Sequence, residues 1–222
     1  MSIIHANVFY RDEIYMTAGL VNTLYGAHML RLFDNGSHTD ITPLLHPPGR
    51  HTVYRRPGAT LTGMWNEAWA LACVTGADYC AVLNNDITVE PDFLTRLADI
   101  LDSRPDLWIA APDPTDTRGP GLVRDVTGGG VGPDGGMPGW AFMVRCEAHE
   151  HGLDRLADPQ FRWWYGDDDL AATVEQLGGR VGVVRGLFCE HKTSTTWNAH
   201  PELHRTAVED GLKFKAKWGR SR

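Results

Sequence analysis

The sequence has few cysteines, and none lies in a metal-binding spacing. Cys73, Cys80, Cys146 and Cys189 form no CxxC pair, which argues against a zinc site or a disulfide framework and predicts reduced core thiols. No apolar run approaches the roughly 18 residues that a membrane span needs, and the first residues lack the character of a signal peptide. We therefore expect a soluble cytoplasmic protein.

The chain also lacks an excess of positive charge. It carries 21 Lys and Arg against 28 Asp and Glu, for a net charge of −7, which disfavours general binding to nucleic acid or to an anionic membrane. The exception is the segment 213–222, which has five basic residues and no acidic one. A solvated terminus is the simplest interpretation, and contact with a polyanionic acceptor or a partner subunit is the alternative.

Several common catalytic motifs are missing. There is no GxxxxGK[ST], no GxGxxG after the first apolar run, and no GxSxG, so P-loop, dinucleotide-binding and serine hydrolase chemistry are not predicted. With 222 residues, of which 42% are hydrophobic, the chain is long enough to bury one core without metals or disulfides.

What the sequence does contain is an alternation of short apolar runs and amphipathic stretches, with no boundary that separates two cores. This rhythm predicts an α/β fold with a mixed, mostly parallel sheet flanked by helices. Residues 43–57, with four prolines and Gly49, are predicted to be a loop, and the glycine-rich stretch 112–139 a functional loop. The expected strands are 2–9, 29–33, 79–83, 107–111, 140–144 and 181–188, and the expected helices are 12–25, 61–74, 91–101 and 170–177.

Acidic residues follow the apolar runs. Asp34, Asp86 and the group 167–169 stand at predicted strand ends or helix starts, where ligands bind in open α/β sheets. Carboxylates that converge at such an edge repel one another unless a cation lies among them. The oxygen donors of residues 84–86 suit Mg²⁺ or Mn²⁺, which commonly bridge to substrate phosphates.

In their order along the chain, these segments resemble family-two glycosyltransferases of the GT-A fold. The similar segments lie within residues 2–197 and are 2–37, the helix that carries Asn66, 77–94, 139–145, 164–170 and 189–191. The resemblance implies a single Rossmann-like GT-A domain over residues 1–197, with a nucleotide-sugar half at 1–111 and an acceptor half at 112–197. Residues 198–222 are then a helical, basic extension.

The resemblance also implies a donor site. Asp34 would accept hydrogen bonds from the base or ribose of a nucleotide, with Arg11 beside it, and Asn66, Asn84 and Asn85 would belong to the same site. Asp86 and His191 would be the ligands of Mn²⁺ or Mg²⁺. Asn84 stands where the family usually has an aspartate. The donor of such an enzyme is most often a UDP- or dTDP-sugar.

For catalysis, the resemblance assigns Asp167 as the general base, with Asp169 as the second candidate, although Gly166 replaces the glutamate that usually precedes this base. One base without an enzyme nucleophile predicts inversion of the anomeric carbon. The acceptor side would include the three residues Gly139, Trp140 and Trp164.

Two alternatives remain open at this point. A nucleotidyltransferase would need a lysine-rich or glycine-rich segment after the first strand, which residues 10–13 do not supply. A non-catalytic nucleotide-sugar-binding protein on the same scaffold is kept open by Asn84 and Gly166. The acceptor could be a hydroxyl of a glycan, a protein, a lipid-linked molecule or a nucleic acid, and a homo-oligomer is also left open.

Overall fold

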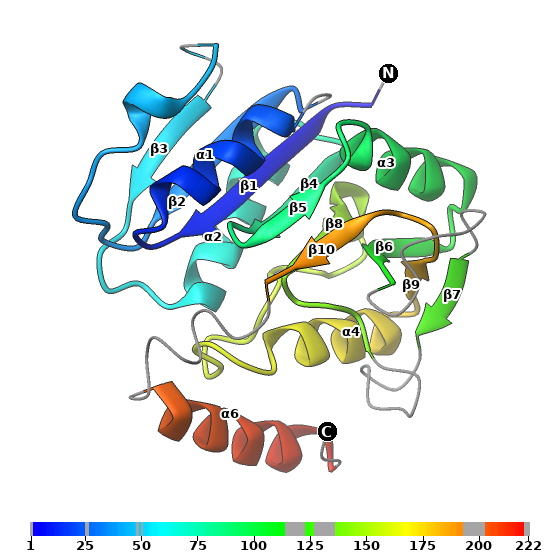
Figure 1. Ribbon diagram of the computed structural model, residues 1–222. Helices are drawn as coiled ribbons and strands as arrows, with labels where there is room; N and C mark the ends of the chain where they lie inside the picture. Colours follow the sequence, from blue (N-terminus) through cyan, green and yellow to red (C-terminus); the bar gives the residue numbers. More distant parts are fainter. Residues whose placement is uncertain are drawn as a thin grey trace.

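The computed structural model describes residues 2–24, 27–47, 49, 51–113, 136–192 and 203–219, and the backbone of 123–126. Its centre is an eight-stranded sheet in the order β3-β2-β1-β4-β8-β6-β9-β7 (Figure 1). The strands are β1 (Ile4–Tyr10), β2 (Met29–Asp34), β3 (His51–Arg55), β4 (Tyr79–Asn84), β6 (Leu107–Pro112), β7 (Val123–Val126), β8 (Ala141–Arg145) and β9 (Arg180–Val184).

Most strands of this sheet run in one direction. β1, β2, β3 and β4 are parallel to one another, β9 is parallel to β6, and only β7 and β8 run against their neighbours. The sheet is therefore mixed and mostly parallel, as predicted. Every residue of β1 is buried, because helices cover both faces of the sheet and leave no polar face for an alternating pattern.

The two faces of the sheet have separate apolar layers. One layer packs under α1 (Ile14–Thr23) and α3 (Phe93–Ser103), and the other under α2 (Leu61–Val74) and α4 (Gly166–Gln176). A small antiparallel pair, β5 (Ile87–Val89) and β10 (Cys189–His191), lies over the first layer. Short 3₁₀ turns occur at Thr42–Leu44 and Cys146–His149.

Helix α6 (Leu203–Trp218) is the last described element. Figure 1 shows it beside α4, on the side that faces away from the sheet. Phe214 of α6 is fully buried, with its ring centroid 5.3 Å from that of Tyr165 and 6.3 Å from that of Phe161. The C-terminal extension is therefore packed on the domain through an aromatic contact.

Four predictions of local structure were wrong. The stretch 112–139, predicted to be a loop, contains strand β7, which pairs with β9 at the sheet edge. Residues 51–55 form β3 rather than a loop, because this β-prone stretch lies between Gly49 and Pro57 and pairs with β2 at the sheet edge. The predicted strand 181–188 ends at Val184, and its last residues lead to β10. The helix expected from Leu170 begins at Gly166, so Asp167, Asp168 and Asp169 form its first turn.

None of the helices in the described part of the chain combines the length and the apolar composition that a bilayer crossing requires.

Candidate functional site at the carboxyl edge of the sheet

The site residues meet at the carboxyl ends of the central strands. Tyr10 at the end of β1 lies beside Asp34 at the end of β2, and Phe9 lies beside Asn84 at the end of β4. Because β8 is antiparallel to β4, its start lies at the same edge, and the backbone N–H of Asn84 donates to the carbonyl of Trp140 at 2.8 Å. The sheet thus brings the predicted donor and acceptor segments together.

Asp34 is a fully buried carboxylate with one oxygen in use. Its Oδ1 accepts the N–H of Ser37 at 2.7 Å, whereas Oδ2 makes no hydrogen bond and lies 3.9 Å from Nε of Arg55. Burial and then the Asp34 carboxylate raise the pKa of Tyr10 beside it. A buried acceptor without a donor is costly in the absence of a ligand, so Oδ2 is suited to accept a hydrogen bond from one.

The loops around Asp34 are tied to each other. Asp12 and Glu13 have positive φ angles of 54° and 41°, and the N–H of Asp12 donates to Oγ of Ser37 at 2.7 Å. His38 donates its N–H to Oδ1 of Asp12 at 3.0 Å. Arg11 precedes this turn and is exposed, so its guanidinium is available to an anionic ligand at the same edge.

Asp86, His191 and Trp140 form the centre of the site. Asp86 is 7% exposed, and its Oδ1 lies 3.2 Å from Nε2 of His191. The His191 ring stacks on Trp140 with the ring centroids 4.9 Å apart. His191 is brought there by β10, whose register places it opposite Ile87 directly after Asp86. Two residues far apart in the sequence are therefore held together by the small sheet.

These donors fit a divalent cation. Oδ1 of Asn84 is buried without a hydrogen-bond partner, and a carboxylate, an amide oxygen and an imidazole are all ligands that Mn²⁺ accepts. No group of three or more His, Cys, Asp or Glu side chains in the described residues converges as a metal cage. Asp86 and His191 would therefore hold such an ion only together with oxygens of the substrate, as is usual for metal–nucleotide complexes.

Asp167 lies against Gly139. It is half-buried in the first turn of α4, next to Asp168 and Asp169, where the helix dipole favours negative charge. A Cβ atom at position 139 would lie 2.7 Å from Oδ2 of Asp167 and 2.9 Å from its Cβ. Glycine is therefore required for this approach, and it links Asp167 through Trp140 to His191 and Asp86.

Three predicted site residues are used elsewhere in the fold. Oδ1 of Asn66 accepts the N–H groups of Leu156 and Ala157, both at 2.9 Å, and its Nδ2 donates to the carbonyl of Ala157 at 2.8 Å. Nδ2 of Asn85 donates to Oγ1 of Thr17 in α1 at 3.1 Å. These two amides fix a turn and a helix beside the site.

Asp169 is the third such residue. It is 2% exposed, and its Oδ2 accepts the N–H of Asp158 at 3.1 Å. Its Oδ1 accepts Nε1 of Trp218 at 2.9 Å and lies 2.8 Å from Nζ of Lys217. Burial lowers the pKa of Lys217, but its hydrogen bonds to Asp169 and Asp158 outweigh burial and raise it overall. Both oxygens of Asp169 are therefore engaged by neighbouring elements.

Trp164 is half-buried just before α4, and its backbone N–H donates to Asp210 of α6. Arg55 and Asp113 also lie at this edge and were not singled out from the sequence. Arg55 follows from the missed strand β3, whose end lies beside Asp34. Asp113 is fully buried after β6, with Oδ2 3.6 Å from Nε of Arg185, and the signal that found Asp86, an acid after an apolar strand, would also have found it.

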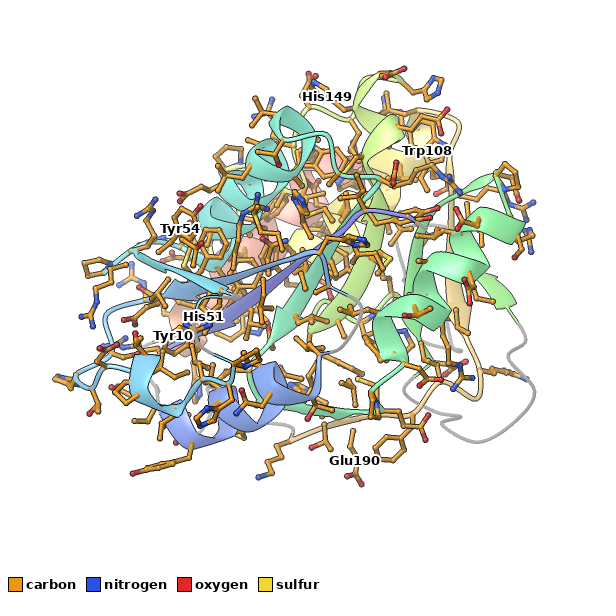
Figure 2. The ribbon with its side chains drawn as sticks, turned by 90° about the horizontal axis from the view of Figure 1, so that it is seen from above. Tyr10, His51, Tyr54, Trp108, His149 and Glu190 are labelled. Carbon is orange, nitrogen blue, oxygen red and sulfur yellow. The ribbon has the colours of Figure 1, made fainter. Side chains whose placement is uncertain are left out.

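A cavity of about 590 Å³ lies at the opposite edge of the sheet, lined among others by Asp78, Asp102, Arg145 and Cys146. Figure 2 shows Trp108 and His149 at that end of the molecule and Glu190, the neighbour of His191, at the other. The cavity contains none of the predicted site residues, so the open edge with Asp34, Asp86 and Asp167 is the stronger candidate.

No protein-family model matches the sequence, and no curated protein sequence does. Solved structures do match. Glucosyl-3-phosphoglycerate synthase from Mycobacterium tuberculosis, in complex with Mn²⁺, UDP-glucose and phosphoglyceric acid, is 14% identical with a TM-score of 0.64, over 100% of this chain and 81% of that chain. A mannosyltransferase from Pyrobaculum calidifontis, in complex with GDP-mannose and Mn²⁺, is 15% identical with a TM-score of 0.62, over 100% and 66%. The expectation of a GT-A fold is confirmed.

Proposed function

We propose that this chain is a metal-dependent glycosyltransferase that moves a sugar from a nucleoside-diphosphate sugar to an acceptor hydroxyl. The observation that carries the proposal is the convergence of Asp34, Asp86 with His191, and Asp167 with Gly139 at one edge of the sheet. At this edge, where α/β sheets bind their ligands, these residues would serve as a hydrogen-bond acceptor for the nucleoside, a cation site and a general base.

The nucleotide-sugar donor would be bound by polar side chains at the ends of β2, β3, β4 and β10. Asp34 offers its free Oδ2 to a hydroxyl or imino donor of the nucleoside, and Arg55 and Arg11 lie at the same edge. Asp86, His191 and the amide oxygen of Asn84 would hold Mn²⁺ or Mg²⁺. When bound, such an ion neutralises the diphosphate and stabilises it as a leaving group.

Asp167 is the proposed general base. It would take the proton of the acceptor hydroxyl while that oxygen attacks the anomeric carbon. Asp169 is the weaker candidate, because Trp218, Lys217 and the N–H of Asp158 occupy both of its oxygens. A single displacement assisted by one base inverts the anomeric carbon, so we propose an inverting transfer. A product with retained configuration, measured by NMR, would overturn this assignment.

The neighbours suggest which donors to test first. The two structures named above contain UDP-glucose and GDP-mannose, and the sequence resemblance adds dTDP-sugars. Trp140, stacked on His191, offers a flat face beside the proposed reaction centre, and Trp164 flanks the start of α4. Aromatic faces of this kind commonly pack on sugar rings, which supports an acceptor or donor sugar between Trp140 and Asp167.

The test compares binding and turnover in two variants. UDP or GDP should raise the melting temperature in the presence of Mn²⁺ and much less in its absence, because the carboxylates repel an unneutralised diphosphate. Asp86→Ala should abolish the Mn²⁺-dependent part of the shift. Asp167→Asn should keep the shift but lose donor hydrolysis, measured as released nucleoside diphosphate.

Each outcome has a clear consequence. No shift with any nucleoside diphosphate would exclude the donor site and with it the proposed function. If the wild type binds nucleoside diphosphates but hydrolyses none of the UDP-, GDP- and dTDP-sugars tested, the non-catalytic binding protein is favoured. Incorporation of a nucleotide into a product would favour the nucleotidyltransferase.

A further inference from the structure

The turn that precedes α4 is organised by a single carboxylate of the C-terminal helix. Oδ2 of Asp210 accepts the backbone N–H groups of Arg162, Trp163 and Trp164 at 3.0, 3.1 and 3.3 Å. Asp210 is fully buried. Three successive N–H groups directed at one anion form a nest, a conformation that depends on the anion for its stability. The carboxylate thus fixes the backbone of this turn.

The charge of Asp210 is balanced within the same contact. Nζ of Lys213 lies 3.0 Å from Oδ1 of Asp210 and donates to the carbonyl of Gln160 at 2.7 Å. Lys213 belongs to the basic segment 213–222, which was expected to be solvated or to contact a polyanionic acceptor or a partner subunit. Its ammonium group bridges α6 to the chain just before the turn, so α6 contacts residues 162–164 through Oδ2 of Asp210 and Gln160 through Lys213.

Tyr165, the next residue, has a strained backbone that α6 supports. It is the N-cap of α4 with φ 64° and ψ 5°, a left-handed conformation that is unfavourable for a residue with a side chain. Its ring packs on Phe214 and over Gly211, where a Cβ would lie 3.0 Å from the Tyr165 hydroxyl oxygen. This conformation turns the chain from the nest into the helix that carries Asp167.

The far side of the same helical turn is also held by α6. Trp218 and Lys217 bind Asp169, and Lys217 reaches Asp158 at 3.0 Å. Asp167 lies between the two contacts, with Oδ2 in a space that excludes a Cβ at Gly139. A displacement of this turn would move Asp167 relative to Gly139, Trp140 and the cation site, which are carried by other elements.

We infer that Asp210 is a positioning residue for the transfer reaction. Through the 162–164 turn, it holds Asp167 in the correct position relative to the donor site. The inference rests on the proposed function. It assigns α6 a role beyond stability: the helix sets the geometry of the acceptor side and leaves the donor side, built from β2, β4 and β10, unaffected. Misplacement of a reacting group by about 1 Å costs on the order of a hundredfold in rate.

The test separates turnover from nucleotide binding. Asp210→Ala should lower donor hydrolysis about a hundredfold, by the same misplacement argument. The affinity for UDP with Mn²⁺ should stay within about twofold, because Asp210 contacts none of the donor-site residues in the described part of the chain. Asp210→Asn keeps one oxygen for the nest and should recover part of the rate. Glu209→Ala is the matched control: it removes a carboxylate one residue away that pairs with exposed Arg205, and it should leave turnover unchanged.

All variants are assayed well below their own melting temperatures, so that a loss of stability is not read as a loss of turnover. The inference would be overturned if Asp210→Ala hydrolyses the donor at the wild-type rate while Asp167→Asn is inactive. The proposed function would then remain intact. Equal losses of turnover and nucleotide affinity would have the same consequence, because they indicate a general structural role. If Asp210→Ala does not fold, the same criteria apply to Asp210→Asn. A wild type that hydrolyses no donor, or an Asp167→Asn variant with full activity, would overturn the proposed function itself.

Discussion

Gly139 lies in close contact with the side chain of Asp167, the proposed general base. Gly139→Ala places a methyl group where the Asp167 side chain lies, so we expect donor hydrolysis to fall at least tenfold, an order consistent with sub-ångström displacement of a catalytic group. The melting temperature should change by only a few degrees, because Gly139 is half-buried and its neighbour is a side chain rather than packed backbone. Steady-state hydrolysis and thermal denaturation measure the two effects.

The matched control is Gly19→Ala. Gly19 lies inside α1, and nothing is within 4 Å of a Cβ built there, so alanine should leave hydrolysis unchanged and stabilise the helix by about 1 kcal/mol. Unchanged hydrolysis in Gly139→Ala would show that Asp167 is not held at this distance during the reaction.

Individual site residues could be predicted from the sequence where they directly follow a strand. Asp34 and Asp86 follow apolar runs, and the topology of an α/β sheet brings such residues together whatever their partners are. Asp169 could not be distinguished from Asp167, because the groups that engage it, Trp218, Lys217 and the N–H of Asp158, are distant in sequence. Local sequence contains no sign of such contacts.

Helix α2 contributes Asn66, whose three hydrogen bonds hold the turn at 156–157. Asn66→Ala should therefore destabilise the protein by roughly 2 to 4 kcal/mol, at about 1 kcal/mol for each bond and some cost for unpaired N–H groups. The affinity for UDP with Mn²⁺ should change by less than about twofold, because the lost partners are not donor-site residues.

Urea denaturation and nucleotide titration give the two numbers. Exposed Thr42→Ala is a suitable control for the loss of a polar side chain, because its hydroxyl donates to Asp40, two residues away and also exposed. A large loss of nucleotide affinity in Asn66→Ala, with unchanged stability, would instead support the nucleotide contact implied by the family resemblance.

Helices and strands were predictable where a hydrophobic pattern extends over many residues, as in α2, α3 and the central strands. β3 was not, because the prolines around it outweighed its short β-prone stretch. β5 and β10 have three residues each and exist as strands only because they pair with each other. The start of α4 was predicted four residues too far along the chain, because its first turn begins with Gly166 and is acidic. The contacts that stabilise this turn come from α6.

The stability of the whole molecule should depend on the buried pair His5 and Arg31. His5 is 3% exposed, and its Nδ1 lies 3.1 Å from Nη1 of Arg31. Burial, Arg31 and His28 lower the pKa of His5 from 6.5 to about 4. Between these two values the unfolded chain binds a proton that the folded protein does not, so stability is full above pH 6.5 and falls as the pH approaches 4.

The expected loss from this one group is at most about 3 kcal/mol. Urea denaturation at intervals from pH 7 to pH 4 measures it, and His5→Gln should flatten the profile relative to wild type. His151→Gln removes an exposed imidazole and should keep the wild-type slope. Parallel profiles for wild type and His5→Gln would show that His5 does not contribute to acid sensitivity.

The arrangement of the whole molecule was predicted only in outline. The alternation of elements indicates an α/β sheet, but nothing local places antiparallel β8 between β4 and β6 or sets the order of the strands. The basic tail also depends on distant partners, because Lys217 binds Asp158 and Asp169, and Lys213 donates to the carbonyl of Gln160. Without knowledge of these contacts, a run of basic residues near the C-terminus predicts a solvent-exposed segment.

The reversed direction of β8 has a consequence for the segment that precedes it. β6 ends at Pro112 and β8 begins at Ala141, and both positions lie at the edge that carries Asp34 and Asp86. The chain therefore leaves and re-enters the sheet at this edge, and the last residues before β8, Gly139 and Trp140, lie against Asp167 and His191. We therefore expect substitutions near the end of this segment to act on the site directly, while pairs such as Cys80 with Val144 keep the sheet in register.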